Sequence, residues 1–512
     1  MVLRELFTRE DIFFLRGDDG RKISGIAADS RKVRPGMIFF CMKGWKADGN
    51  RFAPEAVKNG AVALVTEDPE GVEEMLGKGT TWNEAPRERT SIGNNENAMA
   101  EGVTLIGVRD VRKTFAKACH VFYGKPSEKL ITIGVTGTKG KTTCTYLIRS
   151  ILENAGKRVG LIGTNEIIIG RTHLAAENTT PDALTLQETL RRMVDAGSDC
   201  VVMEVSSQAY KLHRTEGIFF DYGIFTNLSP DHVSPGEHQN FQEYLECKRE
   251  LFRHCRVGII NGDDPYAEAV TQGHSCRLET YGFGEENSLR ASEYCPVEIS
   301  GRLGVRFRVT GEMDLEACIP MPGRFSAYNA LAAICLCRHF HVRETDIQRA
   351  LLSAKVKGRM ESVANGEGWH VYVDYAHNPM ALASLLETLR EYHPKRLVCL
   401  FGCGGDRPVM RRRMMGRISG EKANLTIVTD DNPRSEDPAV IRQQIAEGVR
   451  ESGGEYVEIA GRREAISYAL SNAREGDLII LAGKGHETCQ EIGGEKIPLD
   501  ERKIIGEILS KS

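Results

Sequence analysis

The stretch Gly134-Val-Thr-Gly-Thr-Lys-Gly-Lys-Thr-Thr143 decides the fold, because it has the features of a phosphate-binding loop. An apolar, β-prone run precedes it and a helical pattern follows it. Small residues let backbone N–H groups approach phosphate oxygens, and the helix N-terminus adds partial positive charge. Val135 stands where the usual spacing has glycine, so this is the variant TGT-x-GKTT. The alternative is a turn that only joins a strand to a helix.

Bulk composition narrows the class of protein. A length of 512 residues predicts about three domains. The net charge of −4 and the lack of a strongly basic block argue against nucleic acid as a partner. The N-terminus has charges inside its apolar stretch, and no long uncharged run could span a bilayer, so we expect no signal peptide and no membrane partner. The fourteen cysteines form no CxxC pair, which favours reduced core residues of a cytosolic protein.

The order of strand-like and helical runs predicts an α/β protein of three domains. These are a small N-terminal α/β domain (1–122), a central domain with a largely parallel sheet around the phosphate loop (123–342), and a C-terminal Rossmann-like domain (343–512). The polar segment 68–101 lacks periodicity, and we expect a flexible surface insertion there. The principal predicted strands are 61–65, 200–204, 222–227, 257–261, 370–375, 396–401, 425–429 and 477–482.

Three polar residues follow predicted strands of the central domain or lie on its helices. Glu204 ends a strand, where a carboxylate can hold Mg²⁺ beside a phosphate loop; a helix N-terminus capped by Ser206 is the alternative. His232 could ligate a second metal or contact phosphate, or be structural. Lys248 lies in a helical pattern, and its local context indicates only a solvated lysine.

Polar loops also follow the predicted strands of the C-terminal domain, where open α/β sheets place their ligands. The first loop carries Asp374 and His377, close in the chain order to the segment 358–361 that contains Arg359. The others are 402–407, 430–434 and 483–487. Turns alone do not need Arg, His and Glu together, so these loops indicate a binding site, although 402–407 could merely turn the chain.

The ordered motifs resemble the Mur ligase family of peptidoglycan synthesis, specifically its MurE type. The resemblance extends over nearly the whole chain except about 68–101, and it rests on these segments in family order: Thr136-Gly-Thr-Lys-Gly-Lys-Thr-Thr143, Glu204-Val-Ser-Ser207, Thr226-Asn-Leu-Ser229, Gly358-Arg-Met-Glu361, Asp374-Tyr-Ala-His377 and Asp431-Asn-Pro-Arg434. It implies an ATP-dependent ligase that phosphorylates the D-glutamyl carboxylate of UDP-MurNAc-L-Ala-D-Glu. An amino acid then attacks the acyl phosphate.

The resemblance also implies roles for individual residues. Lys141, Glu204, His232 and Lys248 would be catalytic, and Thr142, Glu204, His232 and a carbamylated Lys248 would hold Mg²⁺. ATP would contact Gly137, Thr138, Lys139, Gly140, Lys141, Thr142, Thr143, Asn329, Arg359, Asp374 and His377. The UDP-sugar and its dipeptide would contact Ser30, Trp45, Lys46, Ala47, Asn178, Thr179, Thr180, Ser206 and Arg214.

The segment Asp431-Asn-Pro-Arg434 looks like the form found in members that add meso-diaminopimelate. This amino acid has a carboxylate where lysine has none, and the planar guanidinium of Arg434 suits it. The implied site comprises Arg407, Asp431, Asn432, Pro433, Arg434, Gly483 and Glu487. The alternatives are a lysine-adding or relaxed ligase, a folylpolyglutamate synthetase-like ligase and a catalytically silent muropeptide-binding protein. We expect a cytoplasmic monomer that acts on small molecules.

Overall fold

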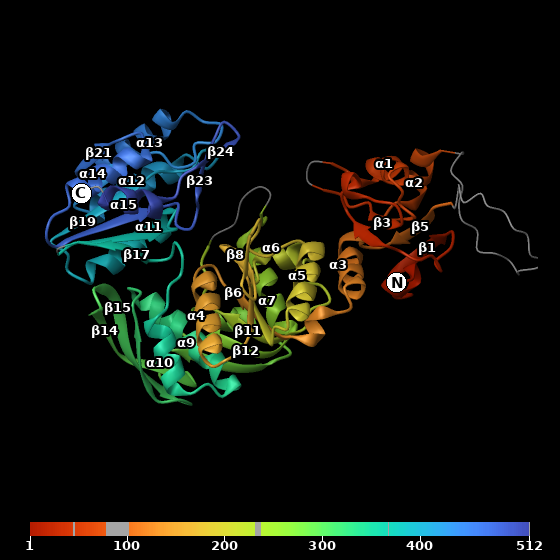
Figure 1. Cartoon of the computed structure of the whole chain (residues 1–512), viewed down its shortest axis with the longest axis horizontal. Helices are drawn as coiled ribbons and strands as arrows, with labels where there is room; N and C mark the ends of the chain where they lie inside the picture. The colour runs from red at the N-terminus through yellow and green to blue at the C-terminus, as the bar shows by residue number, and fades with distance from the viewer. Residues whose placement is uncertain (45–46, 78–101, 231–236, 367, 511–512) are drawn as a thin grey trace, which may run out of the picture. The chain divides into compact units, whose positions relative to one another are not determined.

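The computed structural model describes residues 1–44, 47–77, 102–230, 237–366 and 368–510 (Figure 1). The chain divides into two compact units. Unit one consists of Met1–Lys139, Lys157–Gly258 and Pro265–Leu278, and unit two of Gly140–Gly156, Ile259–Asp264 and Glu279–Ser512. Each unit combines helices with mainly parallel sheets, so the predicted α/β class is confirmed.

Unit one begins with a five-stranded sheet of order β1-β5-β4-β3-β2. Strands β2 to β5 pair in parallel, and β1 is an antiparallel edge. The elements are β1 (Ile12–Arg16), β2 (Gly25–Ala27), β3 (Met37–Phe40), α1 (Ala53–Lys58), β4 (Ala63–Thr66), α2 (Pro69–Leu76), β5 (Thr104–Val108) and α3 (Val111–Phe122). The predicted strand at 61–65 is therefore present, shifted to 63–66.

Helix α2 corrects the prediction that 68–101 lacks structure from its first residue. The Asp68 side chain accepts a hydrogen bond from the Gly71 backbone N–H at 3.0 Å, and Pro69 occupies the first helical position. Val72 is buried, so this short helix has an apolar anchor. Residues 78–101, the rest of the predicted insertion, lie outside the described residues.

Unit one also holds six neighbouring strands of the largest sheet, in the order β11-β6-β10-β7-β8-β9. The strands β11, β6, β10 and β7 pair in parallel and are mostly buried, as expected for a sheet covered on both faces, whereas β8 and β9 are antiparallel. The elements are β6 (Ile131–Thr136), β7 (Val159–Ile162), β8 (Glu166–Ile169), β9 (Thr172–Ala175), α5 (Ala183–Asp195), β10 (Cys200–Glu204), α6 (Ser207–Lys211), β11 (Phe220–Phe225), α7 (Phe241–Arg253) and α8 (Ala267–Thr271). Strands β12 (Cys255–Asn261) and β13 (Arg277–Gly282) contain points where one unit succeeds the other along the chain.

Unit two contains a helical layer and an antiparallel meander. Helix α4 (Lys141–Asn154) packs against α9 (Arg324–Cys337) and α10 (Glu344–Leu352). The meander is β14 (Leu289–Ile299), β15 (Arg302–Gly311) and β16 (Leu315–Ile319), and α10 also packs against β16. The predicted domain boundary at 343 precedes α10 and remains a prediction.

The rest of unit two is a six-stranded sheet of order β17-β18-β22-β19-β20-β21, parallel except for β17. One face packs on α11, α12 and α13, and the other on α14 and α15, which makes it a two-faced, Rossmann-like sheet (Figure 1). The elements are β17 (Glu361–Asn365), β18 (His370–Asp374), α11 (Pro379–Arg390), β19 (Arg396–Phe401), α12 (Met410–Lys422), β20 (Leu425–Val428), α13 (Pro438–Glu451), β21 (Tyr456–Glu458), α14 (Arg462–Ser471), β22 (Asp477–Ala482), the hairpin β23 (Cys489–Ile492) and β24 (Glu495–Pro498), and α15 (Glu501–Leu509).

Local sequence starts several of these helices. The side chains of Asn378, Asp437 and Asp500 accept hydrogen bonds from backbone N–H groups in the first turns of α11, α13 and α15. Pro379 and Pro438 follow two of these caps at the first helical position, where a missing N–H costs nothing. Within the described part of the chain, no helix has the length and apolar character needed to cross a membrane.

Candidate active site

The first half of the phosphate loop belongs to unit one and follows β6. Gly137 has a φ of 149°, and a Cβ there would lie 1.9 Å from Thr226 Oγ1, so only glycine fits. Asn227 holds the next two residues: its carbonyl accepts from Thr138 N at 2.8 Å and its Oδ1 from Lys139 N at 2.9 Å. The segment after β11 thus fixes the course of the loop.

Lys248 is buried rather than solvated, which corrects the interpretation from its local sequence. Only 1% of it is exposed, and its Nζ donates to the Gly137 carbonyl at 2.8 Å. The ammonium also lies 4.6 Å from the centre of the Tyr244 ring. The Tyr244 hydroxyl is 3.0 Å from Thr138 Oγ1, so helix α7 contacts the loop through two side chains.

Glu204 lies at the carboxyl end of β10 and is 1% exposed. Thr164 orients both carboxylate oxygens: its N–H donates to Oε1 at 2.8 Å and its hydroxyl to Oε2 at 3.1 Å. Ser206 is the N-cap residue of α6, but its side chain makes no capping hydrogen bond. The buried carboxylate at the strand end agrees with the metal-ligand interpretation better than with a simple cap.

Several residues predicted to bind the dipeptide lie together in unit one. The Thr180 hydroxyl donates to the Glu204 carbonyl at 2.8 Å and accepts from Ser206 N at 3.0 Å. Arg214 Nη1 donates to the Thr180 carbonyl at 2.7 Å, and Thr179 Oγ1 is 3.0 Å from Thr164 Oγ1. Asn178, by contrast, is exposed.

The residues predicted to bind the UDP-sugar are only partly described. Ser30 is buried, and its hydroxyl donates to Glu55 Oε2 at 2.6 Å. The Ala47 carbonyl accepts from Gly44 N at 2.9 Å. Trp45, Lys46 and the predicted metal ligand His232 lie outside the described residues.

The second half of the phosphate loop belongs to unit two. Gly140 precedes α4 with a φ of 85°, and a Cβ there would lie 2.4 Å from Asn329 Oδ1. Asn329 therefore packs directly against the loop. Lys141, Thr142 and Thr143 form the first turn of α4, where backbone N–H groups have no partner within the helix and can face an anion.

Arg359 connects the predicted nucleotide residues of unit two. Its Nη2 lies 3.5 Å from Thr142 Oγ1, the long limit of a hydrogen bond, and its guanidinium stacks 4.7 Å from the Tyr375 ring centre. Asp374 accepts from the backbone N–H groups of Met360 and Ala376, both at 2.8 Å. Asp374 thus shapes the backbone beside Arg359, and the exposed His377 follows on the same loop.

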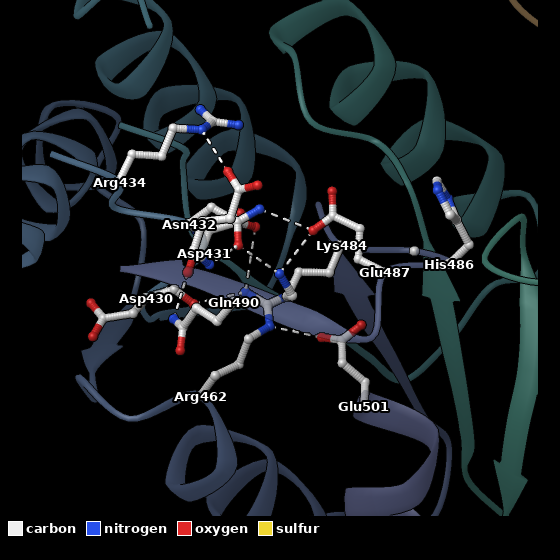
Figure 2. Close-up of polar contacts among 12 residues, drawn as sticks. Asp430, Asp431, Asn432, Arg434, Arg462, Lys484, His486, Glu487, Gln490 and Glu501 are labelled. Atoms are coloured by element: carbon white, nitrogen blue, oxygen red, sulfur yellow. Dashed lines mark hydrogen bonds and ion pairs between the residues drawn. The ribbon is translucent and has the colours of Figure 1, made fainter. Parts of the chain in front are cut away.

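The predicted amino-acid residues come from three loops at the carboxyl ends of β19, β20 and β22. Figure 2 shows Asp431, Asn432, Arg434 and Glu487 from the second and third of these loops. Gly405 N donates to the Asn432 carbonyl at 2.9 Å, and a Cβ on Gly405 would lie 1.9 Å from the Pro433 carbonyl oxygen. A Cβ on Gly483 would lie 2.8 Å from Asp431 Oδ2. These close approaches join the loops, whereas the predicted Arg407 is exposed on the first of them.

Arg434 adopts a left-handed backbone, with a φ of 52°, and is held by the β23–β24 hairpin. Its Nε lies 3.0 Å from Glu491 Oε2, and its Nη1 donates to the Gly405 carbonyl at 2.6 Å. Its backbone N–H donates to the Glu491 carbonyl at 3.0 Å. The guanidinium is thus oriented before any substrate is bound.

The sequence analysis missed three buried charged residues behind these loops. Lys484 Nζ donates to Asn432 Oδ1 at 2.9 Å and to Glu487 Oε2 at 2.8 Å. Arg462 donates to the carbonyls of Asp430 at 3.1 Å and Ala482 at 2.9 Å, and pairs with Glu501 at 2.8 Å (Figure 2). Lys484 lies inside a motif that the sequence singled out, but Arg462 and Glu501 carry no local signal.

Each unit contains an oxygen donor of the kind that Mg²⁺ prefers. In unit one, Glu204 is a buried carboxylate with both oxygens oriented. In unit two, Thr142 offers a hydroxyl at the start of a helix. Among the described residues there is no group of three or more His, Cys, Asp or Glu side chains that could hold a metal.

Three family models match the chain in order. The Mur ligase family catalytic domain matches residues 22–123, the Mur ligase middle domain 135–337, and the Mur ligase glutamate ligase domain 358–485. A protein of Caldanaerobacter subterraneus subsp. tengcongensis, named UDP-N-acetylmuramoyl-L-alanyl-D-glutamate–2,6-diaminopimelate ligase, is 41% identical over 501 residues, 97% of each chain. The chain belongs to the Mur ligase family.

Solved structures agree with membership of the Mur ligases. The structure of a UDP-N-acetylmuramoyl-L-alanyl-D-glutamate–2,6-diaminopimelate ligase matches with a TM-score of 0.68 and 27% identity, and covers 100% of this chain and 99% of its own. A Mycobacterium tuberculosis folylpolyglutamate synthase matches with a TM-score of 0.57 at 17% identity over 72% of this chain, which shows a shared fold alone. The prediction from the ordered motifs is confirmed at the level of the family.

Proposed function

We propose that this Mur ligase is an ATP-dependent amide ligase that adds meso-diaminopimelate to the D-glutamyl residue of UDP-MurNAc-L-Ala-D-Glu. The observation that carries the proposal is the loop Asp431–Arg434. The Arg434 guanidinium is oriented by the Gly405 carbonyl and Glu491, and the Asn432 amide donates to Glu487. Support comes from the relative that is 41% identical along the whole chain and carries diaminopimelate in its name. Solved Mur ligase and folylpolyglutamate synthase structures described with ADP agree with a nucleotide substrate.

The reaction proceeds in two steps. A D-glutamyl carboxylate oxygen attacks the γ-phosphorus of ATP, the bond from that phosphorus to the bridging oxygen breaks, and ADP leaves. The amino group of the incoming amino acid then attacks the acyl carbon of the acyl phosphate and loses a proton. The tetrahedral intermediate collapses, inorganic phosphate leaves with the electrons of the C–O bond, and an amide remains. The first step brings two anions together, and the second develops negative charge on the carbonyl oxygen, so cationic groups must offset this charge.

The chain's own residues provide much of that offset. Gly137 to Thr143 supply backbone N–H groups to the phosphates, and Lys141 binds the terminal phosphates. Asn329 and Arg359 contact the nucleotide, with Asp374 and His377 on the adjoining loop. Thr142 and Glu204, together with His232 and Lys248, would hold Mg²⁺, which would neutralise phosphate charge. Thr180, Ser206 and Arg214 receive the dipeptide, and Ser30 and the segment 45–47 receive the UDP-sugar.

Lys248 takes part as a carbamate in this proposal. Carbon dioxide adds to the neutral amine and a proton is lost, which converts a cation into a carboxylate-like metal ligand. Its burial beside the phosphate loop, with the Gly137 carbonyl at 2.8 Å, supports this role. The variant Lys248→Ala should lose activity by about 10²-fold or more, and small carboxylic acids should restore part of it. A folded variant that these acids leave inactive would count against the carbamate.

Specificity for diaminopimelate follows from charge. Arg434 offers a planar fork to the carboxylate that lysine lacks, and Glu487 suits an ammonium. Arg407, Asp431, Asn432, Pro433 and Gly483 complete the proposed site. Lysine would leave the guanidinium without that partner and place a second cation near it. Sites built for a polar group reject analogues that lack it by up to about 10⁴-fold.

The test is release of phosphate from ATP with UDP-MurNAc-L-Ala-D-Glu, with meso-diaminopimelate or L-lysine as the third substrate. The wild type should strongly prefer diaminopimelate. Arg434→Ala should lower kcat/KM for diaminopimelate by about 10²-fold while lysine use changes little. Arg463→Ala, which removes an exposed arginine paired with Glu507 in the same sheet domain, is the matched control and should behave as wild type.

Other outcomes of this test select the alternatives. Equal use of both amino acids would keep the ligase but reject the specificity, and preference for lysine would make it a lysine-adding member. Addition of glutamate to a folate would favour the folylpolyglutamate synthetase-like ligase. No turnover at all would favour a muropeptide-binding protein. The 22–123 match to a Mur ligase domain is the observation that favours the muropeptide substrate over folate.

The proposal extends to the setting of the reaction. The substrates are small molecules, a nucleotide sugar, ATP and an amino acid, so we propose a cytoplasmic enzyme that works as a monomer. Size-exclusion chromatography with light scattering at micromolar concentration tests the monomer: a mass near 57 kDa agrees with it, and a mass twice as large would reject it.

A further inference from the structure

Lys484 is a buried lysine whose ammonium lies between two side chains of the proposed amino-acid site. None of its surface is exposed. Its Nζ contacts Asn432 Oδ1 at 2.9 Å and Glu487 Oε2 at 2.8 Å (Figure 2). Removing an ammonium from water is costly unless it is paired and hydrogen-bonded, so a lysine here is unfavourable without these two partners.

Lys484 lies between two glycines after β22, and the sequence analysis assigned it no role. The Lys484 side chain reaches toward Asn432 and Glu487, and full burial keeps it from a ligand in solution. The contacts of Lys484 therefore point to the neighbouring side chains as its target rather than to an anion.

The first consequence concerns the amide of Asn432. Its Oδ1 accepts from Lys484 Nζ and from the Glu491 backbone N–H at 3.1 Å, while its Nδ2 donates to Glu487 Oε2 at 3.0 Å. A flipped amide would turn its NH₂ group toward two donors and its oxygen toward a carboxylate. Lys484 thus helps to fix one orientation of Asn432.

The second consequence concerns Glu487. One carboxylate oxygen, Oε2, receives both the ammonium of Lys484 and the amide of Asn432. Lys484, Asn432 and Glu487 therefore each contact the other two and form a closed triangle. The other oxygen of Glu487, Oε1, takes part in none of these three contacts. The triangle holds the carboxylate in one rotamer at the edge of the site.

We propose that Lys484 is a positioning residue for the amino-acid substrate. It acts through two side chains. It holds the Glu487 carboxylate, which would receive the substrate ammonium, and the Asn432 amide beside that carboxylate. This inference rests on the proposed amino-acid ligase function. It assigns Lys484 no contact with ATP or with the UDP-linked dipeptide.

The experiment measures KM separately for meso-diaminopimelate, ATP and UDP-MurNAc-L-Ala-D-Glu in Lys484→Met, which keeps the length of the side chain and removes its charge. KM for diaminopimelate should rise about 10- to 100-fold, the effect of losing charge-assisted hydrogen bonds, while the other two KM values stay within about twofold. Lys496→Met, which removes an exposed lysine from the nearby strand β24, is the matched control and should leave all three unchanged.

A double-mutant cycle asks whether Lys484 acts through Glu487. Lys484→Met combined with Glu487→Gln should raise KM for diaminopimelate by clearly less than the product of the two single effects, because one of the lysine's two targets is already lost. Additive effects would overturn the proposal. An equal rise of all three KM values, which a general loss of structure produces, would overturn it as well.

Two further results keep the proposal open to rejection. If Lys484→Met does not fold, Asn432→Asp serves instead: it keeps an oxygen for Lys484 but sets a carboxylate against Glu487, and it should raise KM for diaminopimelate selectively. An unchanged KM would overturn the proposal. If the wild type itself releases no phosphate with an amino acid, the proposed function fails first and this inference falls with it; if only Lys484→Met keeps its KM, the inference alone falls.

Discussion

His486 follows Lys484 by two residues and lies among cations. Its ring packs 4.9 Å from the Tyr375 ring, and its Nδ1 is buried without a hydrogen-bond partner among the described residues. Burial lowers the pKa of His486 to about 4, and the positive charges of Arg359, Lys357 and Arg502 add to this effect. The histidine is therefore neutral in the folded protein at neutral pH.

This pKa predicts how stability depends on pH. The folded-state pKa of about 4 lies below the unfolded value of 6.5, so between these values the unfolded chain binds more protons. Stability from the neutral ring is complete above about pH 6.5 and is lost as pH falls toward about 4. His486→Gln should weaken the pH dependence of the free energy of unfolding, measured by urea denaturation, by at most about 1.4 kcal/mol per pH unit in this window.

The matched variant for this prediction is Val440→Ala, which shortens an exposed side chain that does not titrate. It should leave the difference in stability between pH 4 and pH 6.5 as in the wild type. Identical pH profiles for the wild type and His486→Gln would contradict the low pKa of His486.

For single residues, the sequence predicted the position on a strand or helix better than the surroundings of the side chain. Lys141 and Glu204 lie where the pattern of strand, loop and helix places them. Lys248 does not follow its local pattern, because its burial depends on the phosphate loop, more than a hundred residues earlier in the chain. The same holds for Arg462, whose partner Glu501 is 39 residues away. A local pattern carries no information on such partners.

Helices α12 and α13 show how glycines determine packing between elements. A Cβ on Gly416 in α12 would lie 2.1 Å from the Ile445 carbonyl oxygen, and a Cβ on Gly448 in α13 would lie 2.1 Å from the Arg413 carbonyl oxygen. The two helices thus approach backbone to backbone at these points. Side chains larger than hydrogen would push them apart.

Two helical glycines should therefore respond in opposite ways to alanine. Gly416→Ala should destabilise the protein by about 1–3 kcal/mol, because it overpacks the α12–α13 contact. Gly506→Ala in α15 should stabilise it by about 0.5–1 kcal/mol, because nothing lies within 4 Å of the added Cβ and alanine has the higher helix propensity. Urea denaturation of both variants tests this pair, and a stabilised Gly416→Ala would contradict the close packing.

Strands could be predicted where the sequence has a continuous apolar run with polar residues at both ends. Strands β10, β19 and β22 have the predicted bounds 200–204, 396–401 and 477–482, because buried parallel strands are continuous apolar runs. Helix α2 was missed because a capped helix of eight residues anchored by Val72 is too short to show a clear period. Strands β14 to β16 were missed because their outward charges, as in Arg306-Phe-Arg308, interrupt the apolar run.

At the scale of the whole molecule, the units do not follow the chain. Unit two takes α4 from the middle of segments that belong to unit one, so most cuts in the chain would separate packed partners. The six-stranded sheet is different, since all its strands lie between 361 and 482. The two buried clusters on its faces draw one residue from before Lys357, Leu303. The boundaries of the three domains that the sequence analysis gave remain predictions.

The fragment from Lys357 to Ser512 should therefore fold alone, with a cooperative unfolding transition and lower stability than in the full chain. Tyr372 loses one hydrogen bond in this fragment, and its substitution therefore measures that contact. Its buried hydroxyl accepts a hydrogen bond from the Leu303 backbone N–H at 2.7 Å, and Leu303 is absent from the fragment. Tyr372→Phe leaves that N–H unsatisfied in the full chain and should cost about 1–3 kcal/mol there, but it should be nearly neutral in the fragment.

A contact inside the fragment provides the comparison. The hydroxyls of Ser419 and Thr426 lie 2.7 Å apart and are both buried, so Ser419→Ala should cost the same in the full chain and in the fragment. Circular dichroism during urea unfolding measures all four variants. A fragment without a cooperative transition would show that its sheet needs the remainder of unit two. An equal loss of unfolding free energy from Tyr372→Phe in both chains would show that Leu303 is not the partner that stabilises this hydroxyl.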